Sequence, residues 1–366
     1  MFSEIYRDKK ILITGHSGFK GSWLSCWLIK LGAEVVGISK DIPTQPSMFE
    51  DLKLESKVKH LECDIRDLAK LAHLINIERP DVVFHLAAQA IVSSSYYDPI
   101  ETITTNAIGT MNLMEILKTL SWPCSAVLIT SDKSYDNVEW EWGYKETDRL
   151  GGKDIYSGSK GAAELIIKSY YHSFFQNKDH LVKLAVARAG NVIGGGDWAK
   201  DRIIVDTVKA WSKNESVEIR SPNATRPWQH VLEPISGYLS LGEKLLINGL
   251  PEGEAFNFGP RAEQNRTVIE LLSTMADNWT ASMPSIPYVV TDNLPFKEAE
   301  LLKLNCDKAL FYLKWDASLN YFQTVEMTAK WYSAYYNGKV SLFDLTIQQI
   351  EDYQNIATQR GSSWTL

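Results

Sequence analysis

KILITGHSGFKG, residues 10–21 of this 366-residue chain, is typical of a short apolar strand that runs through a glycine-rich turn into a helix. Its glycines follow the spacing G-x-x-G-x-x-G, at Gly15, Gly18 and Gly21. Glycines at such a turn let the backbone approach a pyrophosphate, which then lies at the helix N-terminus, where several N–H groups have no intrahelical partner. Because the motif stands between the first strand and the first helix, it predicts a dinucleotide-binding fold.

The following residues continue to alternate between apolar strands and amphipathic helices. After a helix over residues 20–31, we expect strands over residues 34–38, 81–86, 126–129 and 181–187, and helices over residues 67–77, 99–120 and 157–175. Repeated alternation of this kind implies a parallel sheet with helices on both faces. The expected fold class is therefore α/β, a Rossmann-type doubly wound parallel sheet with a smaller C-terminal substrate-binding lobe.

The residue composition changes beyond Gly190, where loops rich in Gly, Pro and Trp begin. Such loops carry function more often than core packing. We expect a nucleotide-binding Rossmann domain over residues 1–188, to which residues 231–259 return, and a substrate lobe over residues 189–230 and 260–366. Residues 352–366 are rich in Gln, Ser and Thr, and a loose tail is expected there.

Composition and charge narrow the class of protein. With 45% hydrophobic and 23% charged residues, the chain has the make-up of an ordinary globular protein. A formal net charge of −7 argues against a nucleic-acid surface, which needs clustered Lys and Arg. Because no export signal and no apolar run of roughly 20 residues is visible, we expect a cytoplasmic protein without a membrane partner. The four cysteines lack metal-ligand spacing, and no metal is expected.

Two short motifs carry the chemistry: TSDK after an apolar strand, and Y-x-x-x-K at the start of a helix. Tyr156 can remove a hydroxyl proton only if its phenolate is accessible, and the ammonium of Lys160, one helical turn away, would stabilise that anion. Ser131 is expected to orient a substrate hydroxyl, Asp132 to protonate a leaving hydroxyl, and Lys133 to assist a second proton transfer. At the carboxyl end of a strand, where doubly wound proteins bind ligands, this combination predicts sugar oxidation coupled to loss of water.

A dinucleotide is expected along the carboxyl edge of the sheet. Asp64 is a candidate for binding the adenine amino group, although it would equally serve to cap the helix that begins near Asp67. The second strand ends in Ser39-Lys40-Asp41, without an acid directly after it for a ribose diol, so NAD and NADP both stay open here, and Lys40 could pair with a 2′-phosphate. The residues expected to bind the cofactor are Gly15, His16, Gly18, Phe19, Lys20, Gly21, Asp64, Ile65, Leu86, Ala87, Ala88, Gln89, Asn106, Thr130, Tyr156 and Lys160.

Four longer motifs extend this pattern. They read HLAAQ at residues 85–89, TSDKSYDN at 130–137, RAGNVIGGGDW at 188–198 and RPWQHVLEP at 226–234. Over residues 10–315 the chain therefore resembles the extended short-chain dehydrogenase/reductase family, in its sugar-nucleotide 4,6-dehydratase group. Most of that group carry Asp-Glu where this chain has Asp132-Lys133. In having lysine at this position, the chain resembles the members that act on CDP-glucose.

The resemblance implies an internal redox cycle. Tyr156 would take the C4 hydroxyl proton while NAD⁺ takes the C4 hydride; water would leave across C5 and C6 with Asp132 as the acid, and the hydride would return to C6. Since no net oxidant is consumed, NAD is the expected cofactor. The resemblance implies CDP-glucose as the substrate and a role in making a deoxysugar for surface polysaccharide. Lys133 is a candidate for the C5 base if it is substantially neutral. The residues implied at the substrate are Gln89, Ser131, Asn191, Asp197, Trp198, Arg202, Arg226 and His230, with Arg226 as the pyrophosphate partner.

The resemblance further implies a homodimer through the helices that begin near Pro99 and Ser157.

Two features depart from the group. Gly158 weakens the first turn of the active-site helix by about 1 kcal/mol relative to alanine, and LPFKEA at residues 294–299 stands where a histidine-flanked motif is expected. Trp228 is expected to pack rather than stack on a base, and Arg188 is equally consistent with an ion pair at the edge of the core.

Two other functions stay open. A sugar-nucleotide 4-epimerase needs Tyr156 and Lys160 but no acid and base for an elimination, so Asp132 and Lys133 favour dehydration. A nucleotide-binding regulator that has lost catalysis is disfavoured because Ser131, Asp132, Tyr156 and Lys160 are all intact.

Overall fold

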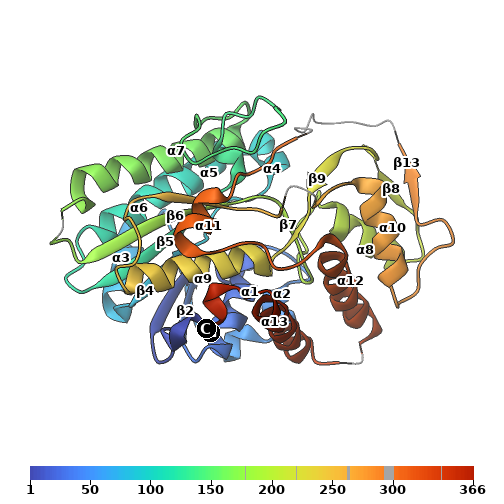
Figure 1. Ribbon diagram of the computed structural model, residues 1–366, viewed down its shortest axis with the longest axis horizontal. Helices are drawn as coiled ribbons and strands as arrows, with labels where there is room; N and C mark the ends of the chain where they lie inside the picture. Colours follow the sequence, from blue (N-terminus) through green and yellow to red (C-terminus); the bar gives the residue numbers. More distant parts are fainter. Residues whose placement is uncertain (178, 220, 262–263, 292–300, 339) are drawn as a thin grey trace.

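The computed structural model describes the chain except for residues 178, 220, 262–263, 292–300 and 339. The departure noted at residues 294–299 therefore lies outside the described residues. A large sheet-containing lobe and a smaller lobe lie side by side, as Figure 1 shows.

The larger lobe is built on one seven-stranded parallel sheet with the strand order β11-β6-β5-β4-β1-β2-β3. Its strands are β1 (Lys10–Thr14), β2 (Glu34–Ser39), β3 (Lys59–Glu62), β4 (Val82–His85), β5 (Cys124–Ile129), β6 (Val182–Ala189) and β11 (Ala255–Phe258). The order reverses between β1 and β4, and open α/β sheets bind ligands outside the carboxyl ends of the strands at such a reversal. The predicted doubly wound fold is confirmed.

Alternate residues of β1 point to opposite faces of the sheet, as the two-residue period of a strand requires. Ile11 and Ile13 join the core beneath α1 (Phe19–Lys30) and α9 (Leu232–Leu246), whereas Leu12 joins the core on the other face. That second face is covered by α3 (Leu68–Glu78), α6 (Gly109–Leu117) and α7 (Ile155–Tyr170). Both faces of β1 are therefore buried, which explains its continuous apolar sequence.

The helix expected over residues 99–120 is divided into three parts. α5 (Pro99–Ile103) passes into a π-helical turn at Thr104–Ile108, and α6 follows. Single π-turns of this kind recur at functional positions in helices. Here the turn contains Asn106, one of the predicted cofactor residues.

α7 carries the Y-x-x-x-K motif and begins at Ile155. The side chain of Asp154 caps it by accepting the backbone N–H of Ser157 at 2.9 Å and the Ser157 hydroxyl at 2.7 Å. A Cβ atom at Gly158 would meet nothing within 4 Å. The cap stabilises the first turn where glycine weakens it.

Residues 232–258 return to the larger lobe, since α9 covers β5 and β6 and β11 pairs with β6. The C-terminus differs from the expectation of a loose tail in a substrate lobe. α13 (Leu342–Gln359) packs on α1, where Lys30 Nζ lies 2.7 Å from Glu351 Oε1, and Trp364 is buried against Phe2. The apolar side chains spaced along α13 bury this end of the chain on the larger lobe.

The smaller lobe contains helices and short two-stranded sheets. Its helices are α8 (Ile203–Ser212), α10 (Val268–Asn278) and α12 (Tyr321–Asn337), and its paired strands are β8 (Val217–Ile219) with β13 (Tyr288–Val290), and β9 (Thr225–Pro227) with β12 (Asn265–Thr267). β7 (Val192–Ile193) and β10 (Gln229–His230) form a further short pair near the boundary between the lobes. Trp228 is buried and donates its indole N–H to the Arg266 carbonyl at 3.1 Å, so it packs as expected.

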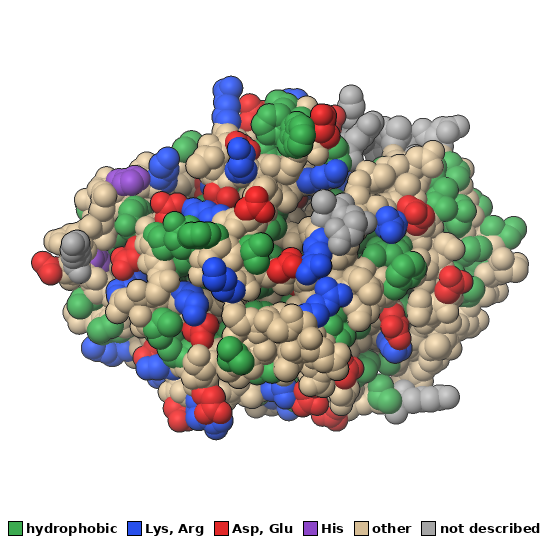
Figure 2. Space-filling view, viewed as in Figure 1, with side chains coloured by type: hydrophobic (Ala, Val, Ile, Leu, Met, Phe, Trp, Pro, Cys, Tyr) green, Lys and Arg blue, Asp and Glu red, His purple; other side chains and the backbone are tan. Residues whose placement is uncertain are grey.

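Charged side chains of both signs are interspersed over the face drawn in Figure 2, without a continuous field of either sign. Among the described residues, no helix combines the length and the apolar character needed to cross a membrane.

Candidate active site

The glycine turn brings the first helix unusually close to the sheet. Gly15 has φ +79°, and a Cβ atom there would lie 2.7 Å from the Ala87 backbone nitrogen. At Gly21 a Cβ atom would lie 2.2 Å from the Gly15 carbonyl oxygen, whereas at Gly18 the nearest contact would be 3.4 Å away. A side chain at Gly15 or Gly21 would therefore clash with the backbone, whereas Gly18 has room for one. This backbone cradle at a helix N-terminus fits the pyrophosphate of a dinucleotide.

Three of the predicted catalytic residues gather where β5 ends. Ser131 follows the strand, and its hydroxyl donates to Asp132 Oδ1 at 2.9 Å. Tyr156, in the first turn of α7, is buried beside them, because α7 packs against the short 3-10 turn Asp132–Ser134. A hydroxyl, a carboxyl group and a phenol thus share one enclosed region.

The electrostatic environment of Tyr156 differs in part from the expectation. Burial raises the pKa of Tyr156 to about 12, while the Arg202 charge and the Ser131 hydroxyl oppose that rise. Lys160 Nζ lies 5.9 Å from the Tyr156 ring centroid, and burial lowers the pKa of Lys160 to about 8. Arg202, which sequence reasoning assigned to the substrate, therefore also acts on the tyrosine.

Asp132 lies where a proton donor would be needed. Its side chain is buried, and burial raises the pKa of its carboxyl group, against the opposing effects of Lys133, Ser131 and Lys20. A carboxyl group in such surroundings keeps its proton to a higher pH than an exposed aspartate does. It is suited to donate a proton to a leaving hydroxyl.

A small hollow connects this chemistry with the predicted substrate residues. Asp132 and Lys133 line it together with Asn191, Arg226, Pro227 and Leu302. Two predicted catalytic side chains, Asp132 and Lys133, therefore meet two predicted substrate side chains at one opening, although Asn191 and Arg226 lie far from them along the chain. The Arg226 guanidinium at this opening suits an anionic group of a substrate.

Beneath the catalytic residues lies a buried ion pair between Arg188 on β6 and Glu164 on α7. The pair is bidentate, with Arg188 Nε 2.8 Å from Glu164 Oε1 and Nη2 3.0 Å from Oε2. Thr130 also donates to Glu164, and Arg188 donates to the Tyr135 hydroxyl at 2.7 Å. Sequence reasoning left the ion-pair role of Arg188 open and did not identify Glu164. The pair fixes β6 against the helix that carries Tyr156, and the Thr130 hydrogen bond to Glu164 joins the end of β5 to the same helix.

Replacing Arg188 with methionine is expected to lower the free energy of unfolding by about 3–5 kcal/mol, because Glu164 would remain buried without its partner. Urea denaturation followed by circular dichroism measures this loss. Lys330→Met, which breaks the exposed Lys330–Glu326 pair on α12, is the control and should cost less than about 1 kcal/mol. A loss as small as that of the control would contradict a structural role for the Arg188–Glu164 pair.

Several predicted cofactor residues have side chains that are used within the protein. His16 lies over Gly37, with Nδ1 2.9 Å from Ser39 Oγ and Nε2 2.8 Å from His60 Nδ1. Its backbone, rather than its imidazole, faces the turn. Lys20 is partly buried and interacts electrostatically with Arg202, Asp132 and Asp197.

Asn106 and Gln89 tie the loop after β4 to the neighbouring helices. The Asn106 amide donates to Ser159 Oγ at 2.9 Å and its Oδ1 accepts the Gln89 N–H at 2.8 Å. The Gln89 amide donates to Thr102 Oγ1 at 2.8 Å. The remaining cofactor candidates of this loop, Leu86, Ala87 and Ala88, are only partly buried. Asn106 and Gln89 therefore hold the edge of the cradle in place.

Asp64 does not cap α3; Asp67 does, by accepting the Lys70 N–H. Asp64 instead binds Arg66, whose Nη2 lies 2.6 Å from Asp64 Oδ2. The adjacent Ile65 is buried against Gly109. The alternative interpretation of Asp64 as a helix cap is thus wrong.

Two substrate candidates lie in the core. His230 is 0% exposed, packs edge-on against Trp23 and approaches Gly194, so it supports the site by packing. Trp198 is buried among three tyrosines of α12, with its ring centroid 4.7 Å from that of Tyr335. Asp197 and Arg202, which flank the Trp198 region, interact electrostatically with one another.

Comparisons with known proteins identify a matching family and several relatives. The model of the family described as GDP-mannose 4,6 dehydratase matches residues 12–328. A CDP-glucose 4,6-dehydratase of Salmonella typhimurium is 44% identical over 97% of this chain and 98% of its own length. A CDP-paratose 2-epimerase of Salmonella typhi is 26% identical over 80% of this chain and 89% of its own.

Two solved structures share the fold. A dTDP-glucose 4,6-dehydratase of Bacillus anthracis in complex with NAD has a TM-score of 0.70 at 20% identity and covers 92% of this chain and 99% of its own. An epimerase of Methanothermobacter thermautotrophicus has a TM-score of 0.77 at 22% identity, over 92% of this chain and 95% of its own.

Proposed function

This chain belongs to the GDP-mannose 4,6-dehydratase family, and from that membership we propose that it is a hydro-lyase that converts CDP-glucose into CDP-4-dehydro-6-deoxy-D-glucose and water. The observation that carries the proposal is the buried Asp132, held by Ser131 and placed beside Tyr156. An epimerase has no need of this acid. The 44% identity to a CDP-glucose 4,6-dehydratase supports the choice of nucleotide and sugar.

The cofactor in this proposal is NAD, held by the backbone of the glycine turn. When bound, it supplies a hydride acceptor for C4 and a hydride donor for C6 of the sugar. Lys160, at the base of the site, would contact the nicotinamide ribose. NAD-bound relatives of the same fold support this assignment.

The residues of the chain supply the proton transfers. Tyr156 takes the proton from the C4 hydroxyl, which Ser131 orients, and Arg202 stabilises the phenolate that results. The C4 ketone makes the C5 proton acidic. A base first removes that proton, and Asp132 then donates its own proton to the C6 hydroxyl, so that water leaves.

Lys133 is the proposed base at C5. It lines the same hollow as Asp132, and it follows Asp132 directly in the chain, where most of the group carry glutamate. An amine acts as a base only when it is neutral. Arg226 and Asn191 would bind the substrate pyrophosphate from the other side of the hollow.

Incubation with CDP-, dTDP-, GDP- and UDP-glucose and NAD⁺ in heavy water, followed by mass spectrometry, tests the proposal. We expect loss of water from CDP-glucose alone, with solvent deuterium gained at C5. Isomers of unchanged composition would indicate a 4-epimerase instead. Dehydration of another nucleotide sugar would overturn the substrate, and no turnover would favour a regulator without catalysis.

We further propose a homodimer, in which α5 and α7 pack against the same helices of a second copy. α5 and α7 contact one another, and both expose apolar side chains: Ile100 is 74% exposed and Leu165 is 55% exposed. Contiguous apolar residues on helices of a soluble protein mark an interaction surface. Light scattering should give twice the mass of the chain, and Ile100→Lys should give the monomer. Leu310→Lys, at an exposed leucine of α11 (Asp307–Leu313), is the control and should leave the mass unchanged. A monomeric parent protein would refute the dimer.

A further inference from the structure

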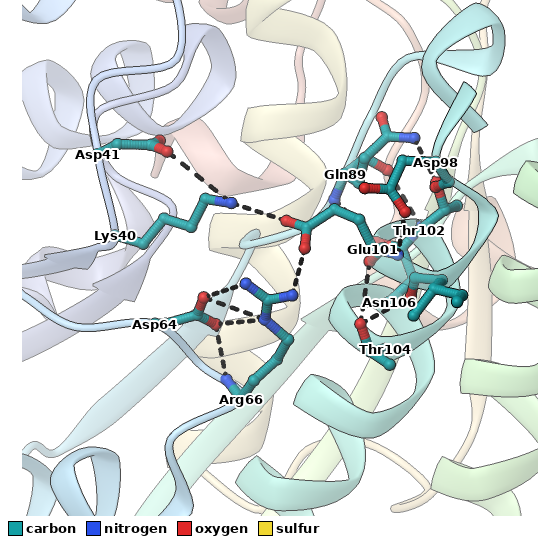
Figure 3. Close-up of polar contacts among 11 residues, drawn as sticks. Lys40, Asp41, Asp64, Arg66, Gln89, Asp98, Glu101, Thr102, Thr104 and Asn106 are labelled. Atoms are coloured by element: carbon teal, nitrogen blue, oxygen red, sulfur yellow. Dashed lines mark hydrogen bonds and ion pairs between the residues drawn. The ribbon is translucent and has the colours of Figure 1, made fainter. Parts of the chain in front are cut away.

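A cluster of five charged side chains lies where β2 and β3 end, next to the glycine turn: Lys40, Asp41, Asp64, Arg66 and Glu101. Lys40 follows β2 and Arg66 comes after β3, while Glu101 reaches them from α5 (Figure 3). Lys40 Nζ lies 2.7 Å from Glu101 Oε1, and Arg66 donates from Nη1 to the other carboxylate oxygen. One carboxylate thus holds two cations that come from two different strands.

The cluster stands at the position that discriminates between dinucleotides in this fold. In doubly wound folds the end of the second strand meets the adenosine ribose, where an acid accepts from a 2′-hydroxyl and a cation accommodates a 2′-phosphate. The chain places Lys40 there. The Ser17 hydroxyl of the glycine turn donates to the Asp41 carbonyl at 2.7 Å, so this corner is fastened directly to the pyrophosphate cradle.

Glu101 is held rigidly in its role. It occupies the first turn of α5, where Asp98 caps the helix by accepting the Glu101 N–H at 2.8 Å. The Gln89 side chain ties Thr102 of the same helix to the loop after β4. Arg66 is fixed as well, because its guanidinium forks onto Asp64 with Nε 3.0 Å from both carboxylate oxygens.

From this geometry we propose that Glu101 makes the chain select a dinucleotide with a free 2′-hydroxyl and reject one with a 2′-phosphate. The selection rests on the proposed function, which puts a dinucleotide at the glycine turn. Glu101 pairs with both cations that a 2′-phosphate would need, in addition to Asp41 at Lys40 and Asp64 at Arg66, and its charge repels that phosphate. A 2′-hydroxyl, in contrast, can donate to the carboxylate. The acid that the end of β2 lacks is supplied from α5.

Calorimetric titration of the full-length protein with NAD⁺ and with NADP⁺ tests this inference without reference to turnover. The parent protein should bind NAD⁺ more tightly. In Glu101→Gln the loss of one negative charge beside Lys40 and Arg66 should strengthen NADP⁺ binding, so that the ratio of the two dissociation constants moves toward NADP⁺ by about tenfold or more. Adding Lys40→Met to that variant should reverse much of the gain.

Glu326→Gln is the matched control, because it removes the same charge from an exposed Glu–Lys pair on α12 and should leave the ratio unchanged. A Glu101→Gln ratio equal to that of the parent would overturn the inference while the proposed function stands. Equal binding of NAD⁺ and NADP⁺ by the parent would also overturn it. A parent protein that binds neither dinucleotide would refute the cofactor of the proposed function itself, and this inference with it.

Discussion

Replacing Tyr156 with phenylalanine is expected to lower kcat for dehydration by about 10²- to 10⁴-fold, because the site loses the group that takes the C4 hydroxyl proton. The aromatic ring stays, so the packing of α7 against the turn at Asp132–Ser134 should be preserved. Steady-state assays with CDP-glucose measure the rate, and thermal unfolding checks the fold.

Tyr170→Phe provides the control on the same helix. The Tyr170 hydroxyl donates to Glu115 on α6, away from the catalytic residues, so its loss should leave kcat near the parent value. A Tyr156→Phe variant that turns over at the parent rate would show that another group removes the proton.

The second large effect is expected for Asp132→Asn. Asparagine cannot donate the proton that the leaving C6 hydroxyl requires, so formation of the dehydrated product should fall by about 10²- to 10⁴-fold. Oxidation at C4 and proton removal at C5 do not use this acid. Substrate recovered from heavy water should therefore carry deuterium at C5, which mass spectrometry and proton NMR detect.

The pH dependence follows from the same residue. Burial raises the pKa of Asp132, so the protonated acid persists to a higher pH than in an exposed aspartate and is lost as the pH rises through that value. Asp132→Asn should lack this fall in rate. Asp67→Asn, at the cap of α3, is the control because asparagine caps a helix as well as aspartate does. Parent-like dehydration by Asp132→Asn would exclude Asp132 as the acid.

The sheet was largely predictable because most of its strands are continuous apolar runs between helices. β3 and β11 were not predicted as strands, and β3 shows the reason more clearly. Its sequence, Lys59-His60-Leu61-Glu62, is mostly polar because it lies at the edge of the sheet, so apolar periodicity does not reveal it. The prediction of a loose C-terminal tail failed for a related reason. The many Gln and Thr residues of α13 interrupt the apolar pattern of the helix face that packs on α1.

The candidate site was predictable where residues follow strands in a motif, as at Ser131 and Asp132. It was not predictable where partners meet only through the fold. Glu164 and Glu101 each lie within a helix and resemble ordinary surface acids in the sequence, yet one is buried against Arg188 and the other joins Lys40 to Arg66. Such long-range ion pairs carry no local sequence signal.

The most direct test of the account uses CDP-glucose labelled with deuterium at C4. An internal redox cycle predicts that the dehydrated product keeps the label, now at C6, in ordinary water and without net consumption of added NAD⁺. Product that carries hydrogen in place of the label at C6, or that forms only with stoichiometric reduction of NAD⁺, would contradict the central claim that this chain removes water by an internal transfer of hydride.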